Sequence, residues 1–314
     1  MQKDHLAERD LNMPDRRSGP LRWMVAGLVL LLGCGLLSAC SSGGSPLASN
    51  TRSSASSASG GNPLASTSTS SAPSRSGQWG TSTQIGPGAN LSGISCVSAT
   101  FCLAVGGTGA FVFNGTTWTA ATPSPDASSL NAVSCVSDTY CMALGQTNSS
   151  IITTVFNGSA WGPPSTLDDA SVVNPESVSC SSTSFCAAVG VGTGNQPDSV
   201  AYTYSGGAWS SASVLGYSIQ LVSVSCPADG SCLAIGSGEA YQYQGNGWSN
   251  GSSTGLDFGS VACSSSGNCL AVGDGTGGES GGYFNAFENG SWSSAQMIGL
   301  EEDPKSASCV TTSP

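Results

Sequence analysis

One pattern occurs five times beyond residue 93: an aliphatic residue, one further residue and a cysteine, then five residues, then Cys-x-Ala-aliphatic-Gly. Each copy continues with an aromatic segment and a Gly and Trp. The first cysteines of successive copies lie 39, 45, 46 and 37 residues apart. A period near 40 with about four strand-like pieces is typical of a propeller blade. The cysteines pair along the sequence as Cys96 and Cys102, Cys135 and Cys141, Cys180 and Cys186, Cys226 and Cys232, and Cys263 and Cys269.

The residues within one copy predict short strands. Those before each first cysteine alternate with a period of two, as in a strand. In residues 102–106, Cys, Ala and Gly form one face of the second strand, and Leu and Val form the other. Because both faces are apolar, this strand should be buried on both sides, and the small face lets a neighbouring sheet approach closely. The aromatic segment predicts a third strand, an Asn/Gly turn follows, and the Trp opens a fourth. We therefore expect an all-β fold, a β-propeller of about five four-stranded blades.

The two cysteines of each copy are expected to form a local disulfide that clasps its blade. They flank a five-residue turn, and a bridge that closes so small a ring stabilises the fold by about 2 kcal/mol. Zinc is the alternative, but it favours closer cysteine spacing or histidines, and the only histidine is His5. Evenly spaced cysteines in an exported chain indicate an oxidising compartment. We expect no metal site.

The ends of the repeat region are incomplete. Gly77-Gln78-Trp79 resembles the fourth strand of a missing preceding copy, and Ser306-Ala307-Ser308-Cys309 resembles the opening of a sixth copy. These fragments supply only a fourth and a first strand, so we expect five blades with extra terminal strands and no full sixth blade. A truncated chain is the alternative, and Cys309 is then an odd thiol or an intermolecular bridge.

The N-terminus predicts export. Residues 1–22 are polar and basic, residues 23–39 are apolar, and the run ends in Leu37-Ser38-Ala39-Cys40. The apolar run is marginal for a bilayer-spanning helix of about 20 residues. The motif resembles the lipobox of bacterial lipoproteins, which implies that Cys40 is acylated and becomes the mature N-terminus. Several acyl chains suffice for stable anchoring. Cys34 is a second candidate for the acylated cysteine, but the residues around it match the lipobox less well. A plain membrane anchor without acylation is the alternative to a lipoprotein. The pair Arg16-Arg17 leaves export by the twin-arginine route open.

These features divide the chain into three parts. Residues 1–39 are predicted to be a lipoprotein signal peptide, residues 40–76 the lipidated cysteine and a disordered Ser/Gly-rich tether, and residues 77–314 the repeat domain. A random coil of this length spans on the order of 30–35 Å. The chain is then lipid-anchored in the cell membrane, and the domain faces the extracellular side.

Charge and residue usage exclude several chemistries. Beyond residue 76, Lys305 is the only cation, against fifteen acidic residues from Asp126 onward. A domain this acidic should repel nucleic acid. Without arginine it lacks the carboxylate-binding cluster of sialidases. Without histidine it lacks a Ser/His or Cys/His nucleophile system.

Carboxylates remain candidates for catalysis, because some five-bladed propellers are glycosidases that use axial acidic residues. Solvated turn acids are the simpler interpretation, since most candidates lie in turns or variable stretches. Residues 273–279 could form a loose calcium loop, but the pattern occurs once and lacks EF-hand spacing. The candidate acids are Asp138, Asp168, Asp169, Glu176, Asp198, Asp229, Asp257, Asp274 and Glu279.

The tryptophan of each copy has two interpretations. It could stack on sugars, or it could be a packing position, and recurrence once per copy favours packing. The five residues are Trp118, Trp161, Trp209, Trp248 and Trp292.

The repeat also resembles repeats in secreted and lipid-anchored proteins of actinobacteria, over about residues 77–310. Those repeats are typically interpreted as β-propeller-like and are mostly of unassigned function, so the resemblance implies a fold and not a reaction. The leading hypothesis is a lipid-anchored cell-surface binding or interaction module without catalytic activity and without a cofactor. Its partner would be a cell-wall glycan or a protein, bound by residues that the sequence does not identify. The alternative is a carbohydrate-binding propeller or a glycosidase with axial carboxylates.

Overall fold

The computed structural model describes residues 84–86, 89–107, 109–121, 129–169, 173–192, 198–265, 267–275, 281–299 and 304–309. The predicted signal peptide, Cys40, the tether and Gly77-Gln78-Trp79 lie outside the described residues. Every element in the described part is a β-strand, twenty-two in all. None of these residues forms a helix long and apolar enough to cross a membrane.

The strands form five antiparallel sheets, one for each copy of the repeat, here called blades 1 to 5. Blade 1 comprises β1 (Leu91–Ser98), β2 (Phe101–Gly106), β3 (Gly109–Phe113) and β4 (Trp118–Ala121). Blade 2 comprises β5 (Ser129–Ser137), β6 (Tyr140–Gln146), β7 (Ser150–Phe156) and β8 (Ser165–Asp169). Blade 3 comprises β9 (Val173–Ser182), β10 (Phe185–Gly192), β11 (Asp198–Ser205), β12 (Ala208–Trp209) and β13 (Ser213–Tyr217).

Blade 4 comprises β14 (Ser223–Ala228), β15 (Ser231–Gly236), β16 (Glu239–Gln244) and β17 (Ser252–Ser253). Blade 5 comprises β18 (Leu256–Cys263), β19 (Cys269–Gly275), β20 (Gly282–Glu288), β21 (Ser291–Trp292) and β22 (Gln296–Gly299). In blades 3 and 5 the fourth strand is split into two pieces, β12 with β13 and β21 with β22, and both pieces pair with the third strand. The predicted all-β fold of repeated four-stranded blades is confirmed with this modification.

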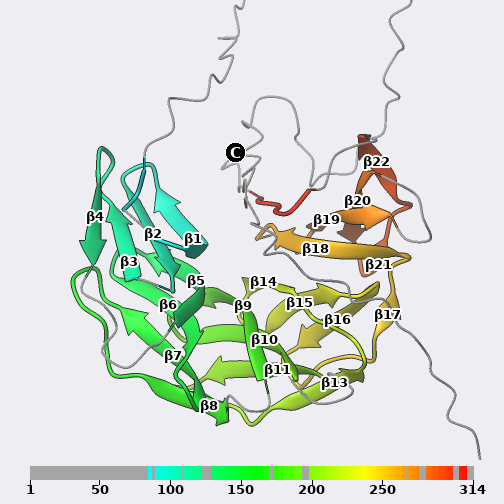
Figure 1. The fold of residues 1–314 in the computed structure, drawn as a ribbon. Coiled ribbons are helices and arrows are strands. Elements are labelled where there is room, and N and C mark those ends of the chain that lie inside the picture. The colour runs from blue at the N-terminus through cyan, green and yellow to red at the C-terminus, as the bar shows by residue number, and fades with distance from the viewer. Residues whose placement is uncertain are drawn as a thin grey trace, which may run out of the picture.

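The blades follow one another around an arc, from the cyan strands of blade 1 to the orange strands of blade 5 (Figure 1). The first strand of each blade contacts the first strand of the next, so these strands converge on the inner side of the arc. This arrangement is that of a β-propeller, in which sheets pack radially.

The two faces of each second strand pack against different neighbours. Leu233 and Ile235 of blade 4 are buried against the small face of blade 5, which includes Cys269 and Ala271. The interface between blades 1 and 2 repeats the arrangement, with Leu103 on one side and Ala143 on the other. As predicted, second strands are buried on both faces.

The glycine that ends the motif is required by a close backbone approach. A Cβ atom added to Gly236 would lie 1.8 Å from the carbonyl oxygen of Gln220, and one on Gly106 would lie 1.9 Å from that of Asn90. These contacts are impossible for any residue with a side chain. The glycine therefore lets the first strand of the blade cross the end of the second.

No blade precedes blade 1 in the part of the chain that the structure describes. Ile94 is 51% exposed, whereas Val133, Val224 and Val261, at the equivalent position of later blades, are 5–8% exposed. On the other flank of the arc, residues 304–309 lie along β18, where the Ala307 N–H donates to Ser260 Oγ at 3.1 Å. This segment occupies the place of a first strand, as expected for the opening of a sixth copy.

The exposed and buried aliphatic positions provide a matched test of blade packing. Val224→Ala should lower the free energy of unfolding by about 2 kcal/mol, because it leaves a cavity between blades 3 and 4. Ile94→Ala, at the uncovered position of blade 1, should cost less than about 1 kcal/mol. Urea denaturation of both variants measures the difference, and equal losses would contradict radial packing.

Candidate functional site

The five predicted disulfides are present, each within one blade: Cys96–Cys102, Cys135–Cys141, Cys180–Cys186, Cys226–Cys232 and Cys263–Cys269. The five-residue turn expected between them is wrong in blades 1 to 4. There the strands continue past the cysteines to a two-residue turn, because residues such as Ser98 and Phe101 still pair. In these four blades the bridge therefore joins two paired strands before their turn, whereas in blade 5 it closes the five-residue connection between Cys263 and Cys269.

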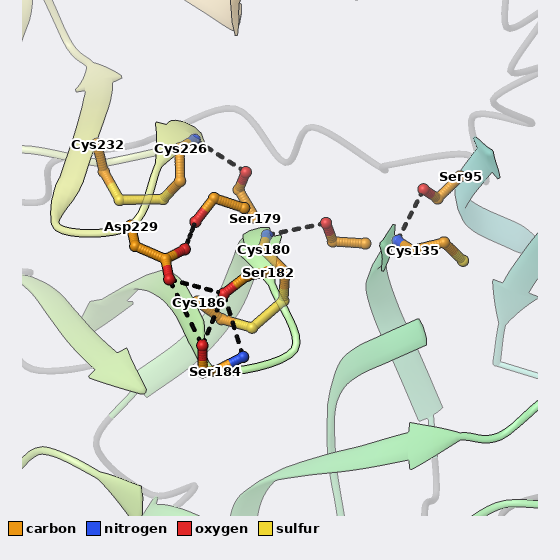
Figure 2. The surroundings of a disulfide bond; sticks show 12 residues. Ser95, Cys135, Ser179, Cys180, Ser182, Ser184, Cys186, Cys226, Asp229 and Cys232 are labelled. Atoms are coloured by element: carbon orange, nitrogen blue, oxygen red, sulfur yellow. Dashed lines mark hydrogen bonds between the residues drawn. A yellow bond between two sulfur atoms is a disulfide. The ribbon is translucent and has the colours of Figure 1, made fainter. Parts of the chain in front are cut away.

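A row of serine hydroxyls connects the first strands of successive blades (Figure 2). Ser179 Oγ in blade 3 accepts the backbone N–H of Cys226 in blade 4 at 3.0 Å. The same bond runs from Cys135 to Ser95 at 2.9 Å, from Cys180 to Ser134 at 2.9 Å and from Cys263 to Ser225 at 3.0 Å. Four successive interfaces thus use one contact, here called the serine row.

A second set of hydroxyls repeats this contact two residues earlier in the strand. Ser177 accepts the N–H of Val224 at 3.3 Å, Ser223 accepts that of Val261 at 3.1 Å, and Ser260 accepts that of Ala307. The first strand of each blade is the edge of its own sheet, so some of its N–H groups point away from that sheet. Unpaired edge groups are costly when buried and invite other strands when exposed. The serines satisfy them.

Asp229, one of the candidate catalytic acids, lies in the first turn of blade 4 and contacts blade 3 (Figure 2). Its carboxylate accepts the hydroxyls of Ser181 at 2.7 Å and Ser182 at 2.9 Å, and that of Ser184 at 3.5 Å. The hydrogen bonds from Ser181 and Ser182 lower the pKa of Asp229. This acid links two blades, which agrees with the simpler interpretation of a turn acid.

The other candidate acids are spread over the molecule. Asp138 lies in a turn, whereas Glu176, Asp198, Asp257 and Asp274 lie in strands. The strands extend further into the variable stretches than the repeat motif indicates. Glu279 lies outside the described residues, as do the side chains of Asp168 and Asp169.

Within the described strands, pairing brings one pair of candidate acids together. Asp257 on β18 lies directly opposite Asp274 on β19. Glu176 is the extra residue of a β-bulge between Pro175 and Ser177, and burial raises the pKa of its carboxyl group. Oδ1 of Asp198 is buried without a hydrogen-bond partner among the described residues.

The calcium loop proposed for residues 273–279 lies largely outside the described residues. Among those the structure describes, no three His, Cys, Asp or Glu side chains gather closely enough to hold a metal ion.

Each repeat tryptophan packs against the aromatic residue of the third strand in its own blade. The ring centroids lie 5.0–5.4 Å apart in Phe113–Trp118, Phe156–Trp161, Tyr204–Trp209, Tyr243–Trp248 and Phe287–Trp292. Such tilted aromatic pairs stabilise a fold beyond the area that they bury. The packing interpretation therefore accounts for the recurrence of the tryptophan.

The residues that sequence analysis missed are the serines. A serine precedes the first cysteine in four of the five copies, and Ala262 replaces it in the fifth. Because an alternating strand needs a polar residue at this position in any case, its recurrence carried no separate signal.

Comparisons with family models and with curated proteins find no match. Several solved propellers are similar in structure. "YCF48 bound to D1 peptide" has 16% identity and a TM-score of 0.46 over 67% of each chain. The GH74 xyloglucanase from Xanthomonas campestris has 15% identity and a TM-score of 0.49, over 71% of this chain and 40% of the enzyme. The WD40 β-propeller domain of Doa1 has 11% identity and a TM-score of 0.37, over 68% of this chain and 84% of the domain.

The serine row can be tested against a matched position. Ser179→Ala leaves the N–H of Cys226 without an acceptor and should lower the free energy of unfolding by about 1–2 kcal/mol. Ser308→Ala changes the equivalent, exposed serine of the partial sixth copy, after which no blade is described, and should cost close to nothing. Chemical denaturation under non-reducing conditions separates the two, and a Ser179→Ala loss no larger than that of Ser308→Ala would refute the role of the hydroxyl.

Proposed function

We propose that the chain is a lipid-anchored cell-surface binding or interaction module without catalytic activity. The two ends of the blades differ in their connections, and this difference carries the proposal. At one end, the connections between first and second strands have two residues in blades 1 to 4 and five in blade 5, and the third strand returns to its first pairing in the fourth after two to four residues. At the opposite end, the connections between second and third strands vary from two to six residues, and those between blades from two to seven. Binding residues commonly lie on variable loops held by a rigid scaffold.

This variable end, here called the loop end, also carries acidic side chains. Asp198 and Glu239 are the first residues of their strands, Asp257 lies near the start of β18, and Asp274 lies near the end of β19. Such a surface favours a neutral or cationic partner over an anionic one. A cell-wall glycan or a protein with a basic segment fits this description, and a nucleic acid does not.

The anchor completes the proposal. The Leu-Ser-Ala-Cys motif at Cys40 provides the attachment, and the Ser/Gly-rich residues 41–76 provide a flexible spacer of about 30–35 Å. A module held this way stays at the outer surface of the membrane while its loop end samples the adjacent cell wall.

Substitution of the anchor cysteine tests the location. Cells that produce the full chain should incorporate a labelled fatty acid into it and retain it in the membrane fraction. Cys40→Ser should abolish the label and the processing, because the acylated thiol is removed, whereas Cys34→Ser should leave both unchanged. Labelling that survives Cys40→Ser, or is lost with Cys34→Ser, would overturn the assignment of the anchor.

A glycosidase is the second candidate, and the opposition of Asp257 and Asp274 is the observation that favours it. Retaining glycosidases hold two carboxyl groups about 5–5.5 Å apart, and Cβ atoms of directly opposed strand residues lie at a similar distance. In the proposed non-catalytic role, the full chain releases no reducing sugar from neutral polysaccharides. Hydrolysis by the wild-type chain that Asp257→Asn and Asp274→Asn abolish, but Asp138→Asn does not, would establish the enzyme instead.

A further inference from the structure

A groove of about 420 Å³ lies between blades 2 and 3. Blade 2 contributes Thr153, Ser165 and Thr166, and blade 3 contributes Tyr204 and Trp209. Among the described residues, no charged side chain lines it. The volume falls within the range of small-molecule sites, which is about 300–1,000 Å³.

Trp209 is the repeat tryptophan that lines this groove. Like the tryptophans at the equivalent position of the other blades, it is half-buried. The position that packs against an aromatic residue in every blade therefore also borders an open groove in blade 3.

The wall that blade 2 contributes is made largely of short side chains, among them Thr153, Thr154, Ser165 and Thr166. The wall from blade 3 includes the aromatic rings of Tyr204 and Trp209. The groove therefore has a hydroxyl-rich side and an aromatic side.

The aromatic side chains that line the groove pack against other residues of the same cluster. Tyr204 packs against Trp209 with ring centroids 5.4 Å apart. Tyr140 of blade 2 belongs to the same cluster, and its hydroxyl is buried without a partner among the described residues. Burial and the neighbouring Tyr204 raise the pKa of Tyr140 to about 12. The aromatic wall is thus a packed surface that a ligand can contact without first ordering it.

The lining defines the chemistry of a ligand. Hydroxyl groups both donate and accept hydrogen bonds, so they suit a ligand that carries hydroxyls of its own. An indole ring offers a flat apolar surface with one N–H donor. In the part of the lining that the structure describes, no carboxylate is present to attract a cation, and the net charge of −11 on the chain disfavours an anion. A neutral pyranose, with an apolar C–H face and a rim of hydroxyls, combines these properties.

We propose that the groove is a subsite for a neutral glycan, in which Trp209 stacks on a pyranose ring and Thr166, Ser165 and Tyr204 bind its hydroxyls. This proposal rests on the binding role proposed above and specifies the class of partner. The proposed subsite is a different surface from the acidic loop end, because the groove lies between two blades.

Calorimetric titration of the full chain in detergent tests the site. The probes are cellotetraose, mannotetraose, maltotetraose and, as an anionic counterpart, tetragalacturonic acid. At least one neutral probe should bind, and the anionic one should not. Trp209→Ala should weaken binding by about tenfold or more, which corresponds to one aromatic contact.

Two further variants distinguish binding from folding. Thr166→Val removes one exposed hydroxyl at nearly constant volume and should weaken binding several-fold while denaturation stays unchanged. Trp118→Ala, at the equivalent position of blade 1 and outside the groove, should leave the affinity unchanged. Three results would overturn the groove as a glycan site. They are no binding of any neutral probe, tighter binding of the anionic probe, and unchanged affinity in both Trp209→Ala and Thr166→Val. If both variants bind with unchanged affinity, binding occurs elsewhere on the chain, and the wider binding role is not contradicted. The presence or absence of the Cys40→Ser variant in the membrane fraction tests the anchored location independently.

Discussion

The arc of blades depends on one contact, the hydrogen bond from a backbone N–H of each blade to a serine hydroxyl of the preceding blade. A first strand has one neighbour in its own sheet, so its other edge must be satisfied from outside. Serine hydroxyls accept these outer N–H groups at the first cysteine of blades 2 to 5. They hold the inner strands at a fixed spacing without merging the five sheets into one, and each blade stays a separate unit.

The disulfides and small side chains act together with these hydroxyls. The bridge joins the first and second strands where the Cys/Ala face turns toward the preceding blade, and residues such as Ala188 and Ala234 are almost completely buried there. A sheet with so small a face can approach its neighbour closely enough for a serine to reach a backbone N–H. Since small side chains bury little apolar area each, covalent clasps contribute stability that a larger core would otherwise supply.

The sequence was sufficient to predict features that arise within one copy. Strand period, cysteine pairing and the packing role of the tryptophans depend on residues at most a few tens of positions apart, and each recurs five times. The serine row joins residues 38–47 positions apart, and its serines look like ordinary outward residues of an alternating strand. The groove at Trp209 depends on the side-chain volumes of two different copies, so no single copy contains it. Strand extensions that place Asp257 opposite Asp274 lie outside the repeated motif and were missed for that reason.

Each blade has a forward face, with serine hydroxyls and the Leu/Val side of its second strand, and a backward face, with N–H groups and the Cys/Ala side of that strand. Every interface therefore has the same polarity, and any copy can follow any other. A gene that encodes such a chain can gain or lose a whole copy and still join only matching faces, whereas loss of half a copy leaves an unmatched one. Copy number is then open to evolutionary change, while single loops and positions such as that of Trp209 diversify independently.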